Sequence, residues 1–284
     1  MAEDLTPPAA PPEPEAAPPR TRHARRVSIA LGALAGLAVL AGAVVVAALG
    51  GSSARDDPAR GWSAWRPSSD GAGGAQQVAD HVAPGYHLPD GRQLVSATGG
   101  KLEVANLPVH VALRANAGSS RISIMQGSAV MYTLCGLGPR CSIRGGSPSP
   151  QRMLLLRREA LEMALYSFRY LDVDNVIALL PPPPPSRAQL KAQARAQASG
   201  SSTPSSAQPQ GAALLFRRSE LQPALSRPLG ATLPAAIPSV RTVTRAPEAS
   251  LVDRVTGPNL FLVSIVQGQD ASAYLVLDPP PRAG

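Results

Sequence analysis

Few residues of this sequence have the types and spacings that chemistry needs. His81 and His87 lie in the segment HVAPGYH, where a proline and a glycine separate them. Two imidazoles placed in this way are able to bind one metal ion on a loop. An exposed, mobile loop is the commoner role of such a segment, and the sequence favours it over a metal site.

Glu159 and Glu162, three positions apart, are spaced as a pair of carboxylates for acid and base catalysis would be. Arg158 and Arg169 fall on the same face of the predicted helix, so we expect a solvated network of charges there instead. The segment DVDN, residues 172–175, offers oxygens as part of a calcium loop does, but it lacks the central glycine and the terminal glutamate. It is predicted to be a turn between a helix and a strand.

Motifs of known chemistry are missing from the sequence. It contains no G-x-S-x-G, no phosphate-binding P-loop, no dinucleotide-binding fingerprint and no internal repeat. We therefore expect no cofactor, no bound metal and a function that is not enzymatic. A hydrolytic enzyme that uses His81, His87 or Glu162 is the alternative that these residues leave open.

The two cysteines, Cys135 and Cys141, stand in the segment TLCGLGPRCSI. Two glycines and a proline between them permit a tight reversal that brings the Cα atoms to the roughly 4.4–6.8 Å that a disulfide requires. We predict a structural disulfide, which stabilises so short a loop by about 2 kcal/mol at most. A redox pair, usually with two intervening residues, and a metal site, which needs more ligands, are the alternatives.

One long helix positions the two glutamates. It is predicted to begin with Ser149 as N-cap and Pro150 as first residue and to end near Leu171. Its apolar residues recur at helical spacing and form a stripe that packs on a sheet. Arg157 falls within this stripe, so its side chain either reaches out to solvent around the first turns or pairs with a carboxylate, and we expect the first.

The other elements are predicted from their periodicity. Residues 109–113 and 122–124 alternate between apolar and polar, as half-buried antiparallel strands do. Residues 175–180 and 259–266 are apolar on both faces, which is typical of central strands covered on both sides. Residues 271–278 follow the turn QGQD and would close a hairpin. Two shorter helical segments are expected at 219–225 and 247–255. Together these elements predict an α+β domain with a mixed sheet, one long helix and one or two short ones.

Residues 27–49 contain no charged side chain over 23 positions, which is enough for a helix to span a hydrocarbon core of about 30 Å. We predict a retained transmembrane helix, with a signal peptide cleaved near Ala47 as the alternative. Four arginines between residues 20 and 26 place the N-terminus in the cytoplasm by the positive-inside rule, and the rest of the chain outside. Gly32 and Gly36 have the spacing of a helix-dimer face, although a helix so rich in Ala and Gly contains such spacings by composition.

Composition divides the rest of the chain. The N-terminal tail, rich in Pro and Ala, is too poor in large apolar residues to fold, and so is an insertion that begins at five consecutive prolines. Trp62 and Trp65 interrupt a linker, where they lie at the membrane interface or pack on the folded domain. The predicted organisation is a disordered cytoplasmic tail at 1–26, a transmembrane helix at 27–49, a linker at 50–75, an extracytoplasmic domain at 76–182 and 211–279, and a disordered insertion at 183–210.

The sequence has 25 Arg, 2 Lys and a net charge of +8. Such usage, with abundant Ala and Pro, suggests a GC-rich bacterial genome. Because the tail has as many acidic residues as arginines, the excess charge belongs to the chain beyond the apolar segment, where it would attract anionic lipid head groups or acidic wall polymers, or simply keep the surface soluble. No dense basic run with interleaved aromatic residues is present, so no nucleic acid partner is expected.

Residues 132–182 and the segment from Ala246 to Pro279 resemble a family of uncharacterised single-pass membrane proteins from GC-rich bacteria. The resemblance implies the same layout, anchored in the cell membrane, and brings no activity or ligand with it.

Three classes of function are compatible with this organisation. The first, which the absence of catalytic motifs favours, is a non-enzymatic cell-envelope accessory protein whose extracytoplasmic domain binds another envelope protein. The second, based on the positive charge, is a binding or sensing module for an acidic wall polymer or a lipid head group. The third is an extracytoplasmic enzyme.

Overall fold

The computed structural model describes residues 61–104, 106–116, 119–138, 141–143, 149–182, 195, 211–268 and 272–280. All described residues belong to one compact unit, residues 57–284. The predicted tail, the segment 27–49 with Gly32 and Gly36, and the predicted insertion apart from Arg195 lie outside the described residues. Within the described residues, no helix has the length and apolar character needed to cross a bilayer.

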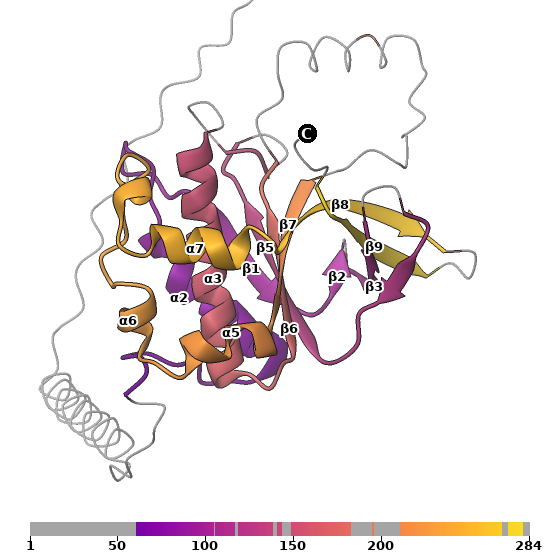
Figure 1. Cartoon of the computed structure of the whole chain (residues 1–284), viewed down its shortest axis with the longest axis horizontal. Coiled ribbons are helices and arrows are strands. Elements are labelled where there is room, and N and C mark those ends of the chain that lie inside the picture. Colours follow the sequence, from indigo (N-terminus) through magenta and orange to yellow (C-terminus); the bar gives the residue numbers. More distant parts are fainter. Residues whose placement is uncertain are drawn as a thin grey trace, which may run out of the picture. The chain divides into compact units, whose positions relative to one another are not determined.

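The described residues form an α+β fold with one mixed sheet of nine strands (Figure 1). The strands are β1 (Ser96–Gly100), β2 (Glu103–Val104), β3 (Leu107–Arg114), β4 (Ile122–Ile124), β5 (Ala129–Cys135), β6 (Asn175–Leu180), β7 (Gly211–Arg217), β8 (Leu260–Gln267) and β9 (Ala273–Asp278). They lie in the order β1-β5-β6-β7-β8-β9-β3-β2, with β4 paired to β3. The pairs β5-β6 and β3-β9 are parallel and the other pairs antiparallel, so the predicted mixed sheet is confirmed.

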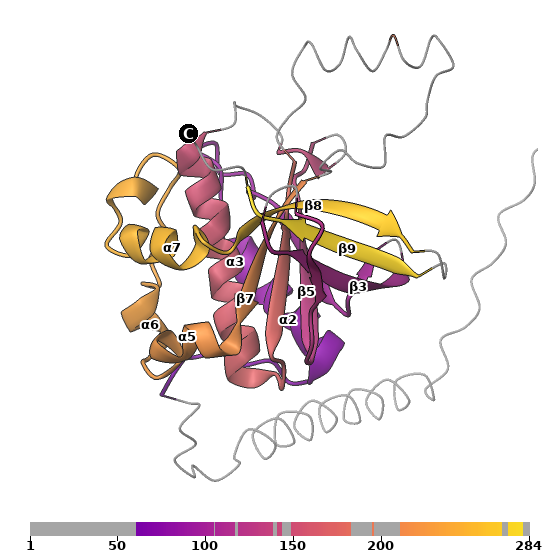
Figure 2. The ribbon, with the colours of Figure 1, turned by 45° about the vertical axis from the view of Figure 1, so that its right-hand side comes forward.

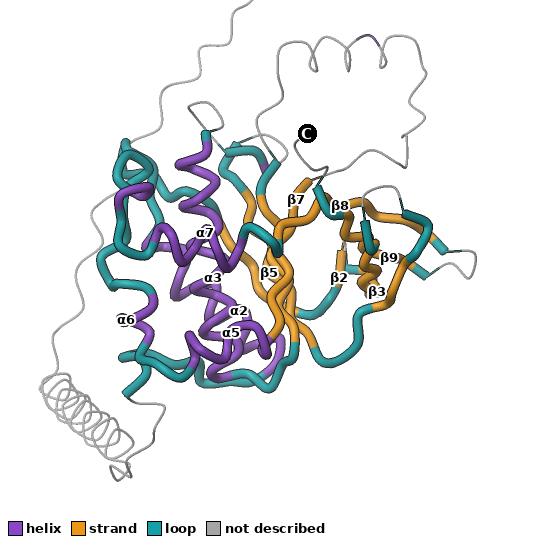
Figure 3. The backbone as a smooth tube through the Cα atoms, viewed as in Figure 1, coloured by secondary structure: helices purple, strands orange, loops and turns teal. Residues whose placement is uncertain are grey.

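Helices gather beside β1, β5, β6 and β7 (Figures 1 and 3). They are α2 (Gly71–Val82), α3 (Pro150–Tyr170), α5 (Arg218–Leu225), α6 (Leu229–Thr232) and α7 (Ala249–Thr256), with 3-10 turns η1 (Ala83–Gly85) and η3 (Val243–Arg245). α3 is the predicted long helix and connects the parallel strands β5 and β6. It begins as predicted, because the Ser149 hydroxyl accepts a hydrogen bond from the Arg152 amide at 3.2 Å and Pro150 is its first residue.

The sheet curls, so that it packs against itself as well as against the helices (Figure 2). Alternate side chains of β6 enter two different cores: Val176 joins the core beneath the helices, and Ile177 joins an interior core with residues of β3, β8 and β9. Only Lys101 and Leu102 separate β1 from β2, which stand at opposite ends of the strand order. The two ends of the sheet therefore lie close together.

Two strands were predicted to be central and covered on both faces, and the structure confirms this for only one of them. β6 is covered on both faces, as predicted, by the helices and by the interior core. The prediction is wrong for β8, where Val263 is the one buried residue. Phe261, Val263 and Ile265 face the interior core, and Leu260 packs against the core beneath the helices. The alternate residues after Leu260 belong to neither core. The predicted hairpin of β8 and β9 is confirmed by their antiparallel register.

β3 pairs with β4 as an antiparallel neighbour, as predicted, but its other long partner is β9, which runs parallel to it. Val109, Val111 and Leu113 of β3 face the interior core, whereas the apolar residues of β4 do not. Ile122 and Ile124, predicted to be the buried side of a strand, are 46% and 44% exposed. β4 lies beside β3 at the margin of the sheet, where the described chain provides no layer to cover these side chains.

α2 lies where the sequence predicts a linker. The helix begins at Gly71, and Trp62 is buried, so the folded part starts before residue 76. The glycines that suggest a linker permit close packing instead: a Cβ on Gly74 would lie 2.2 Å from the Ser69 carbonyl oxygen, and one on Gly99 of β1 would lie 2.3 Å from the Ala75 carbonyl oxygen. Gln76 also protects the edge of the sheet, because its side-chain oxygen accepts a hydrogen bond from the Gly99 amide at 3.1 Å.

Arg218, the first residue of α5, fixes the end of α3. Its guanidinium donates to the carbonyl oxygens of Val173 at 2.9 Å and Leu171 at 2.7 Å, and also to that of Phe168. These are carbonyl groups at and beyond the C-terminus of α3, which have no partner within the helix. The positive charge also lies at the negative end of the helix dipole.

Replacing Arg218 by lysine should therefore lower the free energy of unfolding by about 1–2 kcal/mol, because an ammonium group cannot reach three carbonyls in a fixed fork. Urea unfolding measured by circular dichroism tests this. The neighbouring change Arg217→Lys is the control, since Arg217 makes an exposed pair with Glu220 at 2.9 Å. Equal losses of stability for the two variants would show that the three bonds of Arg218 do not stabilise the end of α3.

Candidate functional site

The polar face of α3 is buried, which contradicts the predicted solvated network. Arg158 is 1% exposed and Glu159 is 0% exposed. The reason is that a later part of the chain, residues 226–256 with α6, η3 and α7, lies over α3. We call this part the outer segment.

Arg158 connects three parts of the fold. It donates to Glu248 Oε1 at 2.8 Å and to the Pro234 carbonyl oxygen at 2.6 Å, both in the outer segment. It also donates to the Tyr86 hydroxyl and, at 3.3 Å, to Glu162 Oε2. The Tyr86 hydroxyl in turn donates to the same Glu162 oxygen at 2.6 Å. The guanidinium is therefore held on several sides and its contacts stabilise the fold.

The two glutamates differ in their surroundings. Burial raises the pKa of Glu162, while its bonds with Tyr86 and Arg158 lower it in part. Burial raises the pKa of Glu159 well above its ordinary value, and the nearby charge of Glu162 raises it further. Within the part of the chain that the structure describes, neither carboxyl oxygen of Glu159 has a hydrogen-bond partner. Glu159 therefore keeps its proton to a higher pH than an exposed glutamate, but a substrate has no access to it.

A surface cavity of about 440 Å³ opens over α2, near this cluster. It is lined by Trp65, Arg66, Ser68, Gln77, Asp80 and His81. We call it the aromatic pocket. The rings of Trp65 and His81 are stacked, with centroids 4.0 Å apart and planes 8° apart, and the Tyr166 ring is T-shaped to both. His81 is thus fixed at the end of a helix and is not in a mobile loop, and burial lowers its pKa.

The other predicted site residues lie apart from this pocket. His87 is exposed, with its Nδ1 at 3.1 Å from the Gly85 carbonyl oxygen. In the described part of the chain no three side chains of the metal-binding types come together. The predicted connection from helix to strand is confirmed for residues 172–174, since α3 ends at Tyr170 and β6 already begins at Asn175. Asp174 Oδ2 accepts bonds from the Ser128 amide and hydroxyl, both at 2.9 Å, and these bonds lower the pKa of Asp174.

Arg157 has the partner that we did not expect. Its Nη2 donates to Asp253 Oδ1 at 2.8 Å and its Nε donates to the Thr256 hydroxyl at 2.5 Å, both in α7. The prediction that it reaches out to solvent is wrong, because α7 covers this side of α3 and supplies a carboxylate.

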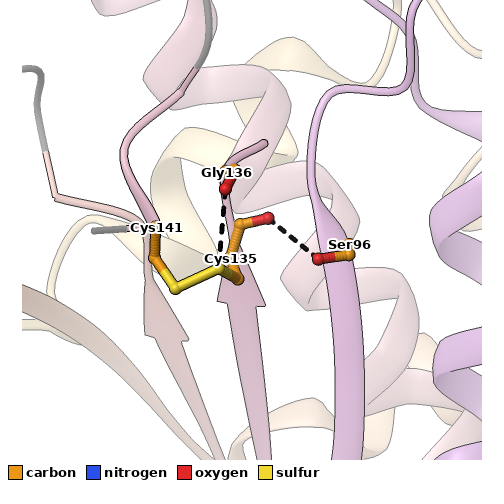
Figure 4. Close-up of a disulfide and its surroundings, with 4 residues drawn as sticks. All are labelled: Ser96, Cys135, Gly136 and Cys141. Carbon is orange, nitrogen blue, oxygen red and sulfur yellow. Dashed lines mark hydrogen bonds between the residues drawn. A yellow bond between two sulfur atoms is a disulfide. The ribbon is translucent and has the colours of Figure 1, made fainter. Parts of the chain in front are cut away.

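The two cysteines are bonded to each other, with Cα atoms 4.5 Å apart (Figure 4). Cys135 ends β5, and the Ser96 hydroxyl of β1 donates to its carbonyl oxygen at 3.1 Å. The reversal is tight, since a Cβ on Gly136 would lie 2.2 Å from the Ser142 carbonyl oxygen. The predicted disulfide is therefore confirmed.

Because this disulfide closes a short loop, replacing both cysteines by serine should lower the free energy of unfolding by only about 1–2 kcal/mol, with the fold retained. Thermal unfolding of the serine variant, compared with that of the oxidised wild-type chain, measures this loss of stability. Thermal unfolding of the wild-type chain with a reductant should give a similar loss. A complete loss of structure on reduction would contradict a purely local role.

Comparison with protein-family models, with curated proteins and with solved structures gave no match. The sequence had directed attention to His81, His87 and Glu162. The structure connects His81 and Glu162 indirectly through α3, because Tyr166 contacts His81 and follows Glu162 by one helical turn. Trp65 and Tyr86 were missed as site residues, because nothing in their local sequence indicates which elements they contact.

Proposed function

We propose that this chain is a single-pass membrane protein whose extracytoplasmic domain binds another protein of the cell envelope and is not an enzyme. The charge-free segment 27–49 and the arginines before it support this topology. The disulfide between Cys135 and Cys141 suits an oxidising compartment. Of the two glutamates best spaced for catalysis, Glu162 is bonded to Tyr86 and Arg158 and Glu159 is fully buried, which favours a binding role over catalysis.

The outer face of β4, β3, β9 and β8 is the observation that carries this proposal. The register of these strands places Ile124, Ala112, Val276 and Ser264 in one row across the four strands. Ile124 at the end of this row is exposed, whereas Ala112 and Val276 in its middle are buried. Beside this row, Val266 is 43% exposed, close to the exposure of Ile122 and Ile124. The described helices lie on the other part of the sheet (Figures 1 and 2). Exposed apolar residues gathered on one face are typical of protein-binding surfaces.

The border of this face indicates the chemistry of the partner. Arg121 is exposed directly before Ile122, and Asp278, the one acidic residue of these four strands, is already paired with Arg114. We therefore propose an envelope protein that offers an apolar surface next to an acidic side chain. The apolar contact would provide affinity and the charge would orient the partner.

In-cell crosslinking from a photoreactive residue at position 124 of the full-length chain tests the proposal, with position 90 as a matched exposed control away from this face. We expect one or two envelope proteins captured from position 124 alone, and their loss in an Ile122→Glu variant. Identical products from both positions, or none at all, would rule out this face as the binding surface.

The proposed topology needs a separate test. A cysteine placed at the exposed Ser69 should react with an impermeant maleimide in intact cells. Protection in intact cells, together with labelling after lysis, would show that the domain is on the cytoplasmic side.

A second function, binding of an acidic polymer or lipid head group, is favoured by the outer segment. It has four exposed arginines, at 227, 241, 245 and 254. Its acidic residues Glu248 and Asp253 are both paired with arginines of α3. If this function holds, retention on an anionic polymer should fall with salt and with Arg241→Gln plus Arg245→Gln, and salt-independent retention would exclude it.

A further inference from the structure

The aromatic pocket has the features of a built site that neither proposed function uses. Its central ring, Trp65, is partly exposed and is fixed from several directions. His81 stacks on one face of it, and the Tyr166 ring is T-shaped to it with centroids 5.4 Å apart. The Ser63 hydroxyl bonds to the Trp65 carbonyl oxygen and lies 2.8 Å from the Tyr170 hydroxyl. A ligand would therefore meet a ring that loses little freedom on binding.

Further aromatic rings pack against Tyr166 beneath the pocket. Trp62 is buried and meets the edges of Tyr166 and Tyr170, with centroids 5.6 Å and 5.8 Å apart. Burial raises the pKa of Tyr166 to about 12, so its hydroxyl is neutral at physiological pH. The wall of the pocket is thus a rigid, uncharged aromatic surface.

Polar groups of α2 stand beside the aromatic surface. Gln77, Asp80 and His81 lie three and four positions apart, which places them on one face of the helix. Gln77 Oε1 accepts from the Ser68 amide at 2.7 Å and from its hydroxyl at 3.2 Å, so the side-chain nitrogen of Gln77 is left to donate. Asp80 Oδ1 accepts from Gln76 at 2.8 Å, and its carboxylate is exposed. The pocket therefore presents a planar donor and a planar acceptor next to a flat apolar ring.

We infer that the aromatic pocket binds a neutral saccharide. A pyranose ring has one face of C–H groups, which can lie on an aromatic plane, and an edge of hydroxyl groups that both donate and accept. Asp80 accepts from such hydroxyls and Gln77 donates to them. The volume of about 440 Å³ falls within the range of small-ligand sites. Arg66 and Asp80 both line the pocket, so the lining does not have the single sign of charge that would select a charged ligand.

Fluorescence titration tests this, because the chain has two tryptophans and Trp62→Phe leaves Trp65 as the single emitter. The purified full-length chain is kept in a detergent whose head group is not a sugar, since a sugar head group would compete. The probes are a β-linked tetrasaccharide of N-acetylglucosamine, maltotetraose and phosphocholine. We expect a saturable change in Trp65 fluorescence with at least one saccharide, with a Kd of about 0.1–1 mM.

Variants distinguish this site from non-specific binding. Asp80→Ala and Gln77→Ala should each weaken saccharide binding by about tenfold, the equivalent of one hydrogen bond. Asp90→Ala, an equally exposed change outside the pocket, should have no effect, and circular dichroism confirms that each variant is folded. The proposal is overturned if Trp65 fluorescence does not change with either saccharide up to about 20 mM. It is also overturned if Asp80→Ala leaves saccharide binding intact. Binding of phosphocholine alone would replace it with a cation site.

Discussion

Replacing Arg158 by methionine should lower the free energy of unfolding by about 3–5 kcal/mol, the largest effect we expect from any single substitution in the described residues. The change leaves Glu248 as a buried charge without its partner and removes the donors of the Tyr86 hydroxyl and the Pro234 carbonyl. Chemical denaturation followed by circular dichroism measures the loss.

The adjacent residue provides a matched control. Arg157→Met removes an arginine from the same helix, but its partner Asp253 has a side chain that is 70% exposed and that water can solvate. We expect a loss of about 1 kcal/mol or less from the ion pair at this position. Similar losses at the two positions would show that the Arg158 cluster does not hold the outer segment.

A double variant separates the net contribution of the ion pair to stability from the penalty of leaving one of its charges buried and unpaired. Arg158→Met combined with Glu248→Leu removes both charges together, so no buried charge is left unpaired. Much of the lost stability should return, because replacing a buried pair by apolar residues is often close to neutral. If the double variant is as unstable as Arg158→Met, the unpaired glutamate is not the source of the loss.

Replacing Glu159 by leucine should raise the free energy of unfolding at pH 8 by about 2–3 kcal/mol, since it removes a buried polar group that lacks partners. The pH dependence follows from the raised pKa of Glu159 in the folded chain. Its contribution to stability is fully present below the pKa of the unfolded glutamate, about 4.3, and is lost as the pH rises through the folded value.

Stability of the wild-type chain should therefore fall between weakly acidic and alkaline pH, and Glu159→Gln should flatten this part of the curve. Urea midpoints at a series of pH values measure the slope. Glu103→Gln, in the short strand β2, controls for the loss of one negative charge. An unchanged slope in Glu159→Gln would mean that this carboxyl group is ionised at the same pH in the folded and unfolded chain.

The sequence predicted α3 well and its polar face badly, for one physical reason. Helix capping is local, so Ser149 and Pro150 sufficed to locate the start. Burial of Arg158 and Glu159 depends on the outer segment, which begins more than 60 residues later and contains only short helices. Periodicity identifies which residues share a face, but it does not show what covers that face.

α2 illustrates the opposite error. Its glycines gave the composition of a linker, and only the close approach of Gly74 to Leu171 and of Ala75 to Gly99 shows why they are needed in a helix. The aromatic pocket was missed with it, since His81 meets Trp65 only once this helix has formed. The disulfide and the connection at 172–174 were predicted correctly because both depend on contacts between nearby residues or on local turn chemistry.

The parallel pairing of β3 with β9 joins residues 109–113 to residues 273–277. Contacts between partners so far apart in the sequence raise the contact order, which slows folding. The interior core includes residues of β9, so it is incomplete until residues 273–277 have been synthesised. Deleting β9 alone would therefore remove far more structure than the strand itself.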